Sequence, residues 1–278
     1  MSAMRKIAMT SDNHFDVNQL DANELLTQQA AYLLAQHYTD YLIAGDLFND
    51  FTASVAYVEA LAKRLAPQCR VFFIAGNHDM VRGADFATLQ SGVNGHYVHQ
   101  KMIDFPGTNY VLIGNNGWYD YQFAQVPDKT AADFAQWKRA YWIDGVIEQP
   151  LSDRQRMELV LSDTAAKLAQ AAAQHKQVLY MTHFVPQDAY ISHVPRQPHW
   201  EMANALMGSP RLGALLSRYH VAYALFGHTH FKYPPRQIAG TTYFCRPVGY
   251  GTKRHYEWKF GTDFISEWQA CLQTLVLE

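Results

Sequence analysis

Residues 222–230 read AYALFGHTH, a short apolar run that ends in a glycine and two histidines. A run that is apolar throughout, rather than alternating, predicts a strand covered on both faces. One histidine at the end of such a strand is most often an ordinary polar cap. Two imidazoles one residue apart indicate metal ligands, because imidazole is the commonest nitrogen donor to protein-bound metals. The remaining question is whether the rest of the chain supplies oxygen ligands.

Five further apolar runs along the chain also end in polar or glycine-containing clusters. They are KIAMTSD (6–12), YLIAGD (41–46), VFFIAGNHD (71–79), YVLIGNN (110–116) and QVLYMTH (177–183). Apolar residues recur with helical spacing between the first three runs, at 22–38 and 54–66. This alternation of strands and helices predicts an α/β domain with a largely parallel core. Ligand sites in such sheets lie at the carboxyl ends of the strands, so the six endings are candidates for one site.

Two segments interrupt this pattern. Residues 118–175 begin with aromatic side chains and end in a long helical stretch after Ser152, which predicts a helical insertion that covers part of the site. Residues 186–200 contain three prolines and little periodicity, which predicts a long surface loop of the kind that is usually functional. The stretches at 241–251 and 271–278 predict further strands in a second sheet. We expect a single domain over residues 1–278.

Composition limits the class of protein and of partner. The chain has 278 residues, of which 49% are hydrophobic, so one large core is possible. Lysine plus arginine (23) nearly balances aspartate plus glutamate (25), which argues against long nucleic acid as a partner. The three cysteines, Cys69, Cys245 and Cys271, form neither a disulfide framework nor a CxxC metal motif and suit a reducing compartment. With no signal-peptide core and no membrane-spanning run, we expect a soluble, cytoplasmic protein.

The polar strand endings supply carboxylate, amide and imidazole donors. The candidate metal ligands are Asp12, His14, Asp46, Asn77, His183, His228 and His230. This mixture suits Mn, Fe or Zn rather than a thiolate zinc site or an all-oxygen calcium site. Seven ligands exceed what one such ion needs, whereas two ions that share a carboxylate would use them all. The sequence therefore predicts two metal ions.

These endings also form an ordered set of motifs. DNH (12–14), GD (45–46), GNHD (76–79), a strand ending in His183 and GHTH (227–230) follow one another along the chain. In this order they resemble the pattern DxH, GD, GNH[DE], His and GHxH of the calcineurin-like metallophosphoesterase superfamily. The resemblance implies a two-sheet β-sandwich flanked by helices. It also implies hydrolysis of a phosphate ester by a hydroxide that bridges two metal ions.

The resemblance further implies a role for each residue. Asp12, His14 and His230 would hold one metal ion, Asn77, His183 and His228 would hold the other, and Asp46 would bridge the two. His78 would contact the phosphate and assist the leaving group, with Asp79 orienting its imidazole. The chain departs from the family pattern at two places. Asn49 replaces an aspartate found in many members three residues after the GD aspartate, and RPVGYG (246–251) replaces an asparagine-proline-glycine run, which would change a wall of the site.

Residues that contact the substrate are harder to identify from sequence. The candidates for the pocket rim are Arg82, Trp118, Tyr119, His193, Arg196 and His199. An arginine and an aromatic side chain near the metals suit a nucleotide or another aromatic phosphate ester. The ordinary alternative for each is a solvated loop charge or a core aromatic. The covering segments favour a small phosphorylated substrate, and we expect a phosphodiester or nucleotide.

Other functions remain open at this point. Phosphomonoesterases, cyclic-nucleotide diesterases, nucleases and diphosphate hydrolases would all use the same metals. A non-catalytic protein-interaction module on the same fold is an alternative of a different class. It predicts substitutions within the motifs, whereas every metal position and His78 carry the residue that the family pattern requires.

Overall fold

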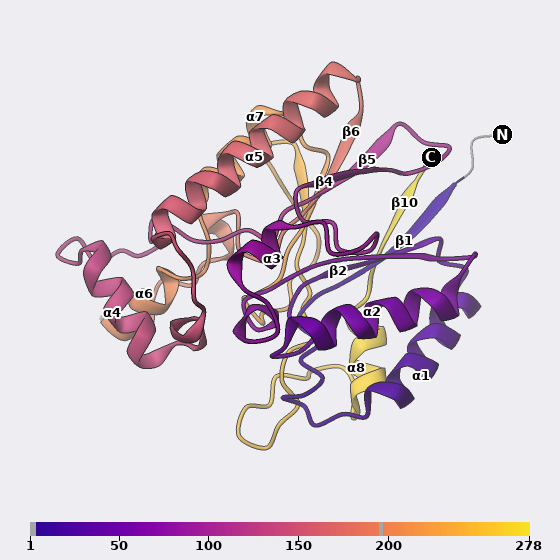
Figure 1. Cartoon of the computed structure of the whole chain (residues 1–278), viewed down its shortest axis with the longest axis horizontal. Helices are drawn as coiled ribbons and strands as arrows, with labels where there is room; N and C mark the ends of the chain where they lie inside the picture. The colour runs from indigo at the N-terminus through magenta and orange to yellow at the C-terminus, as the bar shows by residue number, and fades with distance from the viewer. Residues whose placement is uncertain (1–3, 195–196) are drawn as a thin grey trace.

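A computed structural model of the chain describes residues 4–194 and 197–278 and contains two β-sheets (Figure 1). The first has the order β10-β1-β2-β3, made of β1 (Arg5–Thr10), β2 (Asp40–Ala44), β3 (Arg70–Ile74) and β10 (Gln273–Leu277). The second has the order β4-β5-β6-β7-β9-β8, made of β4 (Lys101–Asp104), β5 (Tyr110–Gly114), β6 (Gln177–Met181), β7 (Tyr223–Leu225), β8 (Arg236–Ile238) and β9 (Thr241–Phe244). The inner strands are parallel, and antiparallel strands lie at three of the four sheet edges.

The two sheets pack face to face around one apolar cluster. Its members alternate along the strands of both sheets, and they include Ile7, Met9, Leu42, Ile74, Leu112, Leu179, Met181 and Leu225. The intervening residues of the same strands join a second cluster with the helices, so both faces of each inner strand are buried. This double burial is the reason for their continuous hydrophobicity. The expected two-sheet sandwich flanked by helices is confirmed.

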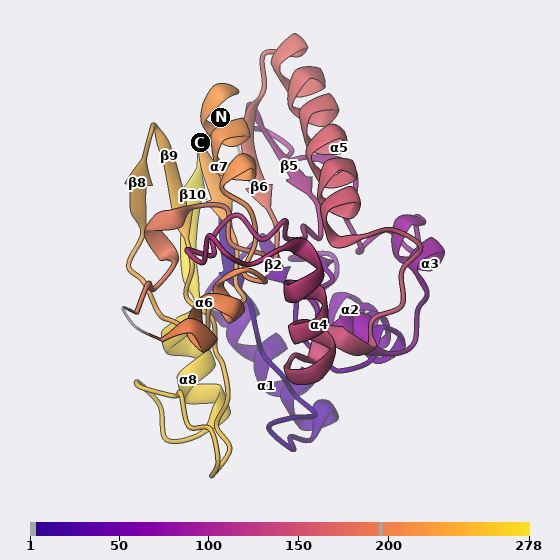
Figure 2. The same cartoon turned by 90° about the vertical axis from the view of Figure 1, so that its left-hand side faces the viewer.

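Helices cover the outer face of each sheet (Figure 1 and Figure 2). The first sheet carries α1 (Ala22–Ala35), α2 (Phe51–Leu65) and α8 (Phe264–Cys271), and the second carries α5 (Asp153–Ala173) and α7 (Pro210–Arg218). A short helix, α3 (Phe86–Gln90), follows β3. The Ser152 side chain caps α5 as expected, and Gln155 completes a capping box.

The last strand joins a different sheet from the one that we expected. Only 241–244 of the predicted 241–251 strand is extended in the second sheet, whereas β10 pairs with β1 in the first, with Arg5 opposite Leu277. Pairing there covers an edge of β1 that would otherwise be open. It also directs Leu275 and Leu277 into the core between the sheets.

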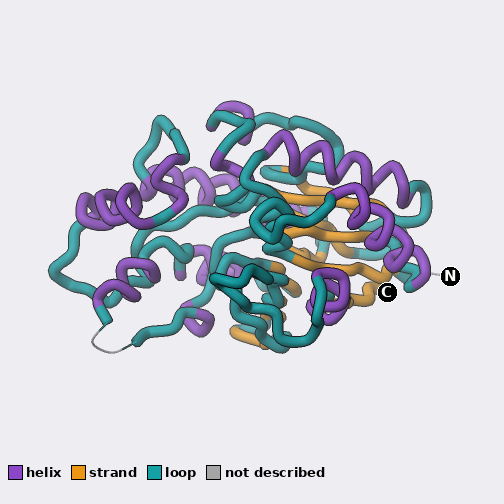
Figure 3. Tube along the Cα trace, turned by 90° about the horizontal axis from the view of Figure 1, so that it is seen from below, coloured by secondary structure: helices purple, strands orange, loops and turns teal. Residues whose placement is uncertain are grey.

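The two covering segments contain helices that extend beyond the ends of the strands (Figure 3). Residues 118–175 include α4 (Ala131–Tyr141), a 3-10 turn at Ile143–Val146, and α5. Residues 186–200 include a 3-10 turn at Asp188–Tyr190 and enter α6 (Pro198–Asn204), so part of the expected loop is helical. Pro198 occupies the first turn of α6, where its missing N–H is no cost to the helix.

The structure shows the state of the cysteines and the character of the helices. All three cysteines are buried and unpaired. Burial raises the pKa of the Cys69 and Cys271 thiols to about 12, so both stay protonated and pack as small apolar groups. Among the described residues, no helix is both long enough and apolar enough to cross a membrane.

A buried ion pair joins the parts of the 118–175 segment. The Asp153 carboxylate accepts hydrogen bonds from Lys138 Nζ at 2.7 Å, from Trp118 Nε1 at 2.8 Å and from the Tyr121 hydroxyl. These donors come from α4 and from the chain after β5, while Asp153 begins α5. One carboxylate therefore holds three pieces of the segment together.

We expect Asp153→Ala to lower the free energy of unfolding by about 3–5 kcal/mol, because it leaves the buried Lys138 ammonium without a partner. Glu158→Ala, which removes the exposed ion pair with Arg211, is the control and should change stability by less than about 1 kcal/mol. Urea denaturation followed by tryptophan fluorescence measures both. Equal losses in the two variants would contradict this role for Asp153.

Candidate metal centre

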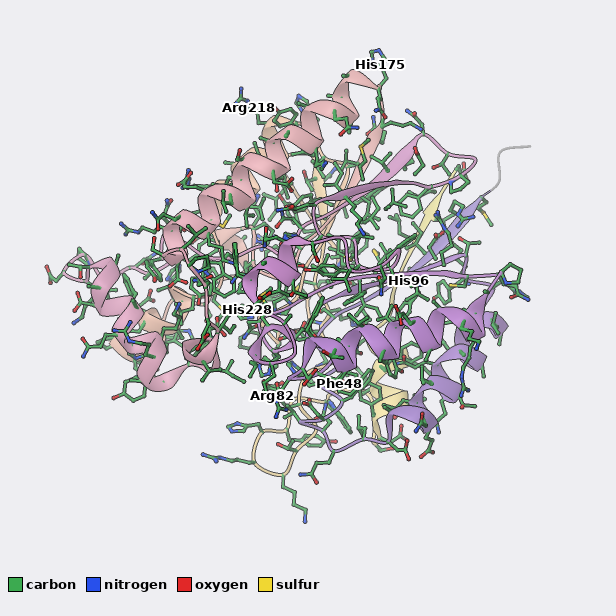
Figure 4. The ribbon with its side chains drawn as sticks, in the orientation of Figure 1. Phe48, Arg82, His96, His175, Arg218 and His228 are labelled. Atoms are coloured by element: carbon green, nitrogen blue, oxygen red, sulfur yellow. The ribbon has the colours of Figure 1, made fainter. Side chains whose placement is uncertain are left out.

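The loops that follow the strands of both sheets meet at one end of the sandwich. Asp12 and His14 follow β1, Asp46 follows β2, Asn77 follows β3, His183 follows β6, and His228 and His230 follow β7. Backbone hydrogen bonds join these loops: Asp12 N–H donates to Gly45 O, and Gly227 N–H donates to His183 O, both at 3.0 Å. His228, labelled in Figure 4, is buried at this end of the sandwich. All seven candidate ligands come together there.

Four of these residues form a first donor group. His14 Nε2 lies 3.0 Å from His230 Nε2 and 3.8 Å from Asp46 Oδ2. His230 Nε2 lies 3.4 Å from Asp12 Oδ1. One ligand atom of each residue lies within 4.8 Å of the corresponding atoms of the others.

A second donor group shares Asp46 with the first. His183 Nε2 lies 3.2 Å from Asp46 Oδ2 and 3.2 Å from His228 Nδ1. The same nitrogen lies 3.0 Å from Asn77 Oδ1. The Asp46 carboxylate is thus the point at which the two groups meet.

The spacing of the donors suits bound cations. Ligands about 2.0–2.2 Å from one ion, at right angles to each other, lie about 3 Å apart, close to the shortest separations found here. Asp46 Oδ2 is also buried without a hydrogen-bond partner, which is costly for a carboxylate oxygen unless a positive charge compensates it. The residues therefore fit a divalent metal ion, and carboxylate, amide and imidazole donors favour Mn, Fe or Zn.

The electrostatics of the site also favour positive charge. Burial alone would lower the pKa of His230, but hydrogen bonds to the Asp12 and Glu257 carboxylates raise it to about 10. Burial likewise opposes the charged form of His183, yet Asp46 raises its pKa to about 9. By contrast, burial and the charge of His183 lower the pKa of His228 to about 3. The carboxylates of the site thus create a potential that stabilises cations.

Backbone conformation is unusual at the same positions. Five of the seven candidate ligands have positive φ: Asp12 (55°), His14 (47°), Asp46 (59°), His228 (69°) and His230 (54°). Each non-glycine residue in this region costs on the order of 1–3 kcal/mol when the conformation is strained. Such residues cluster where function requires a particular side-chain direction. The clustering supports a functional site independently of the donor distances.

Two acidic residues outside the motifs orient ligands. Glu257 Oε2 lies 2.7 Å from His230 Nδ1, an arrangement that directs Nε2 into the site. Asp144 Oδ1 accepts a hydrogen bond from Asn77 Nδ2 at 2.7 Å, so Asn77 Oδ1 faces His183. Sequence reasoning missed both, since no local motif surrounds either residue. Their roles depend on contacts across 67 residues for Asp144 and 27 for Glu257.

The imidazole of His78 lies beside the donors but points to other partners. Its Nδ1 lies 2.6 Å from Asn49 Oδ1, and its Nε2 lies 3.1 Å from the Tyr250 hydroxyl. The Asn49 amide oxygen is an acceptor, so the contact places a proton on Nδ1. The expected partner, Asp79, instead accepts hydrogen bonds from Ser54 Oγ and from the backbone N–H groups of Asp46, Leu47, Phe48 and Gly76. Asp79 therefore shapes the loop after β2, and Asn49 orients His78.

A cavity of about 580 Å³ opens above the donor groups. Its floor includes Asp46, Asn77, His78, His228 and His230. Its opposite wall is largely apolar: Tyr141, Trp142, Ile143, Ile191 and Trp200 come from the two covering segments, and Met207 follows α6. The cavity thus joins a polar floor to an aromatic and aliphatic wall.

The residues predicted for the rim fall in several places. Trp118 and Tyr119 are buried and stack on each other with ring centroids 4.5 Å apart, and neither lines the cavity. Arg82 is exposed and donates from Nε to Asn49 O at 3.3 Å (Figure 4). His199 lines the cavity, whereas His193 contacts Glu201. Arg196 lies outside the described residues. Trp118 and Tyr119 are therefore core aromatics, which corrects their prediction as rim residues.

Comparisons with known proteins agree with this architecture. A sequence model of the calcineurin-like phosphoesterase family matches residues 5–232. The structure is similar to that of phosphopantetheinyl hydrolase from Mycobacterium tuberculosis, with 16% identity, a TM-score of 0.72, and coverage of 99% of this chain and 97% of that one. It is also similar to a dimetal phosphatase from Danio rerio, with 11% identity, a TM-score of 0.48 and 87% coverage of both chains. A search of curated protein sequences finds no match.

The fold and the donor groups define a two-sheet protein with a candidate metal centre at the ends of its strands. At 16% identity the similarity to the phosphopantetheinyl hydrolase shows the fold alone. The family match covers most of the chain, and the chain belongs to the calcineurin-like phosphoesterase family.

Asp46 and His78 should have separable effects. We expect Asp46→Ala to abolish both metal binding and activity, because both donor groups lose a ligand. His78→Ala should keep its metal and lower kcat by about 10²- to 10⁴-fold, the usual contribution of a proton-transferring side chain. Metal content by plasma mass spectrometry and steady-state kinetics test this. Loss of metal from the His78 variant would contradict the separation of ligand from catalytic group.

Asp144 should affect metal binding without being a ligand. We expect Asp144→Ala to weaken Mn²⁺ binding by about 10- to 100-fold, because the Asn77 amide is no longer oriented. Asp144→Asn keeps an oxygen acceptor at the same place and serves as the control. Calorimetric titration with Mn²⁺ measures both, and an alanine variant that binds as tightly as the parent would contradict the role.

Proposed function

We propose that the protein is a metal-dependent phosphoesterase that binds two metal ions and hydrolyses a small phosphodiester or nucleotide. The observation that carries this proposal is the pair of donor groups that share Asp46 at the floor of the cavity. We propose Mn, Fe or Zn for the ions. The three unpaired cysteines support the cytoplasm as the place of action.

The reaction depends on charge as well as position. The chemistry that divalent ions supply at such a site is activation of water and neutralisation of the phosphoryl charge. Asp12, His14 and His230 would hold one ion, Asn77, His183 and His228 the other, and Asp46 both.

His78 would act on the substrate rather than on the metals. Its ring lies at the edge of the donor groups and lines the cavity, with Nδ1 held by Asn49. In this orientation Nε2 is the ring nitrogen that faces the cavity, where the Tyr250 hydroxyl is its partner at 3.1 Å. When both ring nitrogens carry a proton, Nε2–H would donate to the ester and stabilise the charge that develops on the leaving oxygen.

The cavity wall supports a substrate with an apolar or aromatic substituent. Tyr141 and Trp142 come from the end of α4, and Trp200 comes from α6. Such side chains contact flat or apolar groups well, but they offer few donors for a second charged group. A phosphodiester with one such substituent suits this wall better than a free phosphomonoester.

A phosphopantetheinyl ester is a second candidate among diesters. Phosphopantetheinyl hydrolase has a similar fold over nearly the whole chain, and the apolar wall could accommodate a long, weakly polar arm. Holo-acyl carrier protein is the appropriate probe, and release of its phosphopantetheine arm can be followed by mass spectrometry.

A comparison of two chromogenic esters tests the preference for diesters. We expect faster hydrolysis of bis-p-nitrophenyl phosphate than of p-nitrophenyl phosphate when both are assayed with Mn, Ni, Mg and Zn. Equal rates would contradict the diester preference. No hydrolysis of any ester by protein with full metal occupancy would instead favour a non-catalytic interaction module.

A further inference from the structure

Tyr250 lies within the RPVGYG stretch (246–251), beyond the residues that match the family model. Its hydroxyl is 3.1 Å from His78 Nε2, and its side chain lines the cavity. Its ring lies 4.6 Å, between centroids, from the rings of both His14 and His230. The Tyr250 ring thus packs against the candidate ligands His14 and His230. Its hydroxyl reaches His78, the residue that we expect to contact the phosphate.

The backbone around Tyr250 is held from several directions. Its N–H donates to Glu257 Oε2 at 2.8 Å, and its carbonyl accepts from Glu257 N–H at 2.7 Å. The preceding residue, Gly249, donates to Asp12 O at 2.9 Å, and the following one, Gly251, donates to Asn18 Oδ1 at 2.7 Å. Gly249 has φ 77°, and a Cβ there would lie 2.6 Å from Glu257 Oε2, so this approach requires glycine.

Such a fixed position suits a hydrogen-bond donor. Donors that are already aimed at developing charge need no reorganisation during the reaction. A phenol offers one O–H donor, and phosphoryl oxygens are strong acceptors. With Asn49 at Nδ1, His78 Nε2 is the acceptor of the Tyr250 O–H in this structure. An ester that contacts Nε2 would leave this donor for a phosphoryl oxygen in the same part of the cavity.

We propose that Tyr250 is a catalytic residue whose hydroxyl donates a hydrogen bond to a non-bridging phosphoryl oxygen of the bound ester, next to His78. This inference rests on the proposed function and adds a contact to the same site. It also assigns a purpose to the departure from the asparagine-proline-glycine run of the family. The altered stretch supplies a phenolic donor to the wall beside the metals.

The alternative is that the Tyr250 ring only supports the His14 and His230 rings. Tyr250→Phe separates the two roles, because it keeps the ring and removes the donor. Tyr256→Phe is the matched control, since Tyr256 lies in the same loop and is 60% exposed. Both variants would be prepared as full chains loaded with Mn²⁺.

Two measurements would be made on each protein. We expect Tyr250→Phe to lower kcat/KM for bis-p-nitrophenyl phosphate by about 10- to 100-fold, mainly through kcat, with unchanged Mn content. It should also weaken the binding of inorganic phosphate by about 10-fold in calorimetric titrations. Tyr256→Phe should match the parent protein in both.

The outcomes distinguish this inference from the proposed function. Parental kinetics and phosphate affinity in Tyr250→Phe would overturn the inference while leaving the phosphoesterase proposal in place, and loss of Mn would show a supporting role instead. If the parent protein hydrolyses no ester but binds phosphate more tightly than Tyr250→Phe does, the contact stands and the proposed function fails.

Discussion

The buried carboxylate of Asp46 is the constraint on which the rest of the site depends. Asp46 Oδ1 accepts a hydrogen bond from the backbone N–H of His78 at 2.9 Å, while Oδ2 has no hydrogen-bond partner and faces both donor groups. The loop that carries Asp46 can approach the loop after β3 because residue 76 is a glycine. A Cβ at that position would lie 2.1 Å from Asp46 Oδ1. Only glycine permits this approach. The motifs GD and GNHD are therefore two halves of one packing arrangement.

The conformational strain of the site lies in the loops that carry the candidate ligands. Several candidate ligands occupy the left-handed region, and two buried carboxylates lie within reach of the same histidines. Paired sheets, each covered by helices, supply the apolar burial that holds such strained loops in place. The packed sheets are rigid and hold the loops in their strained conformations. The donor side chains are therefore already oriented before a cation or a phosphate binds.

The metal donors and the cavity wall have different origins. The donors follow strands of the two sheets, whereas the apolar wall comes from α4, α6 and the turns beside them. Asp144 connects the two, because it belongs to the 118–175 segment and holds the Asn77 amide. A change in the covering segment can therefore reach the metal centre through one hydrogen bond.

The sequence by itself determined strands β1, β2, β3, β5, β6 and β7, the main helices and the candidate ligands, because these are local patterns of hydrophobicity and short motifs. It could not determine that β10 joins the first sheet, that Trp118 packs in the core, or that Asn49 rather than Asp79 meets His78. Glu257 and Asp144 carried no local signal for the same reason, and the RPVGYG stretch indicated a changed wall without showing that Tyr250 meets His78. Their partners are distant in the chain, and only tertiary packing decides which side chains share a buried space.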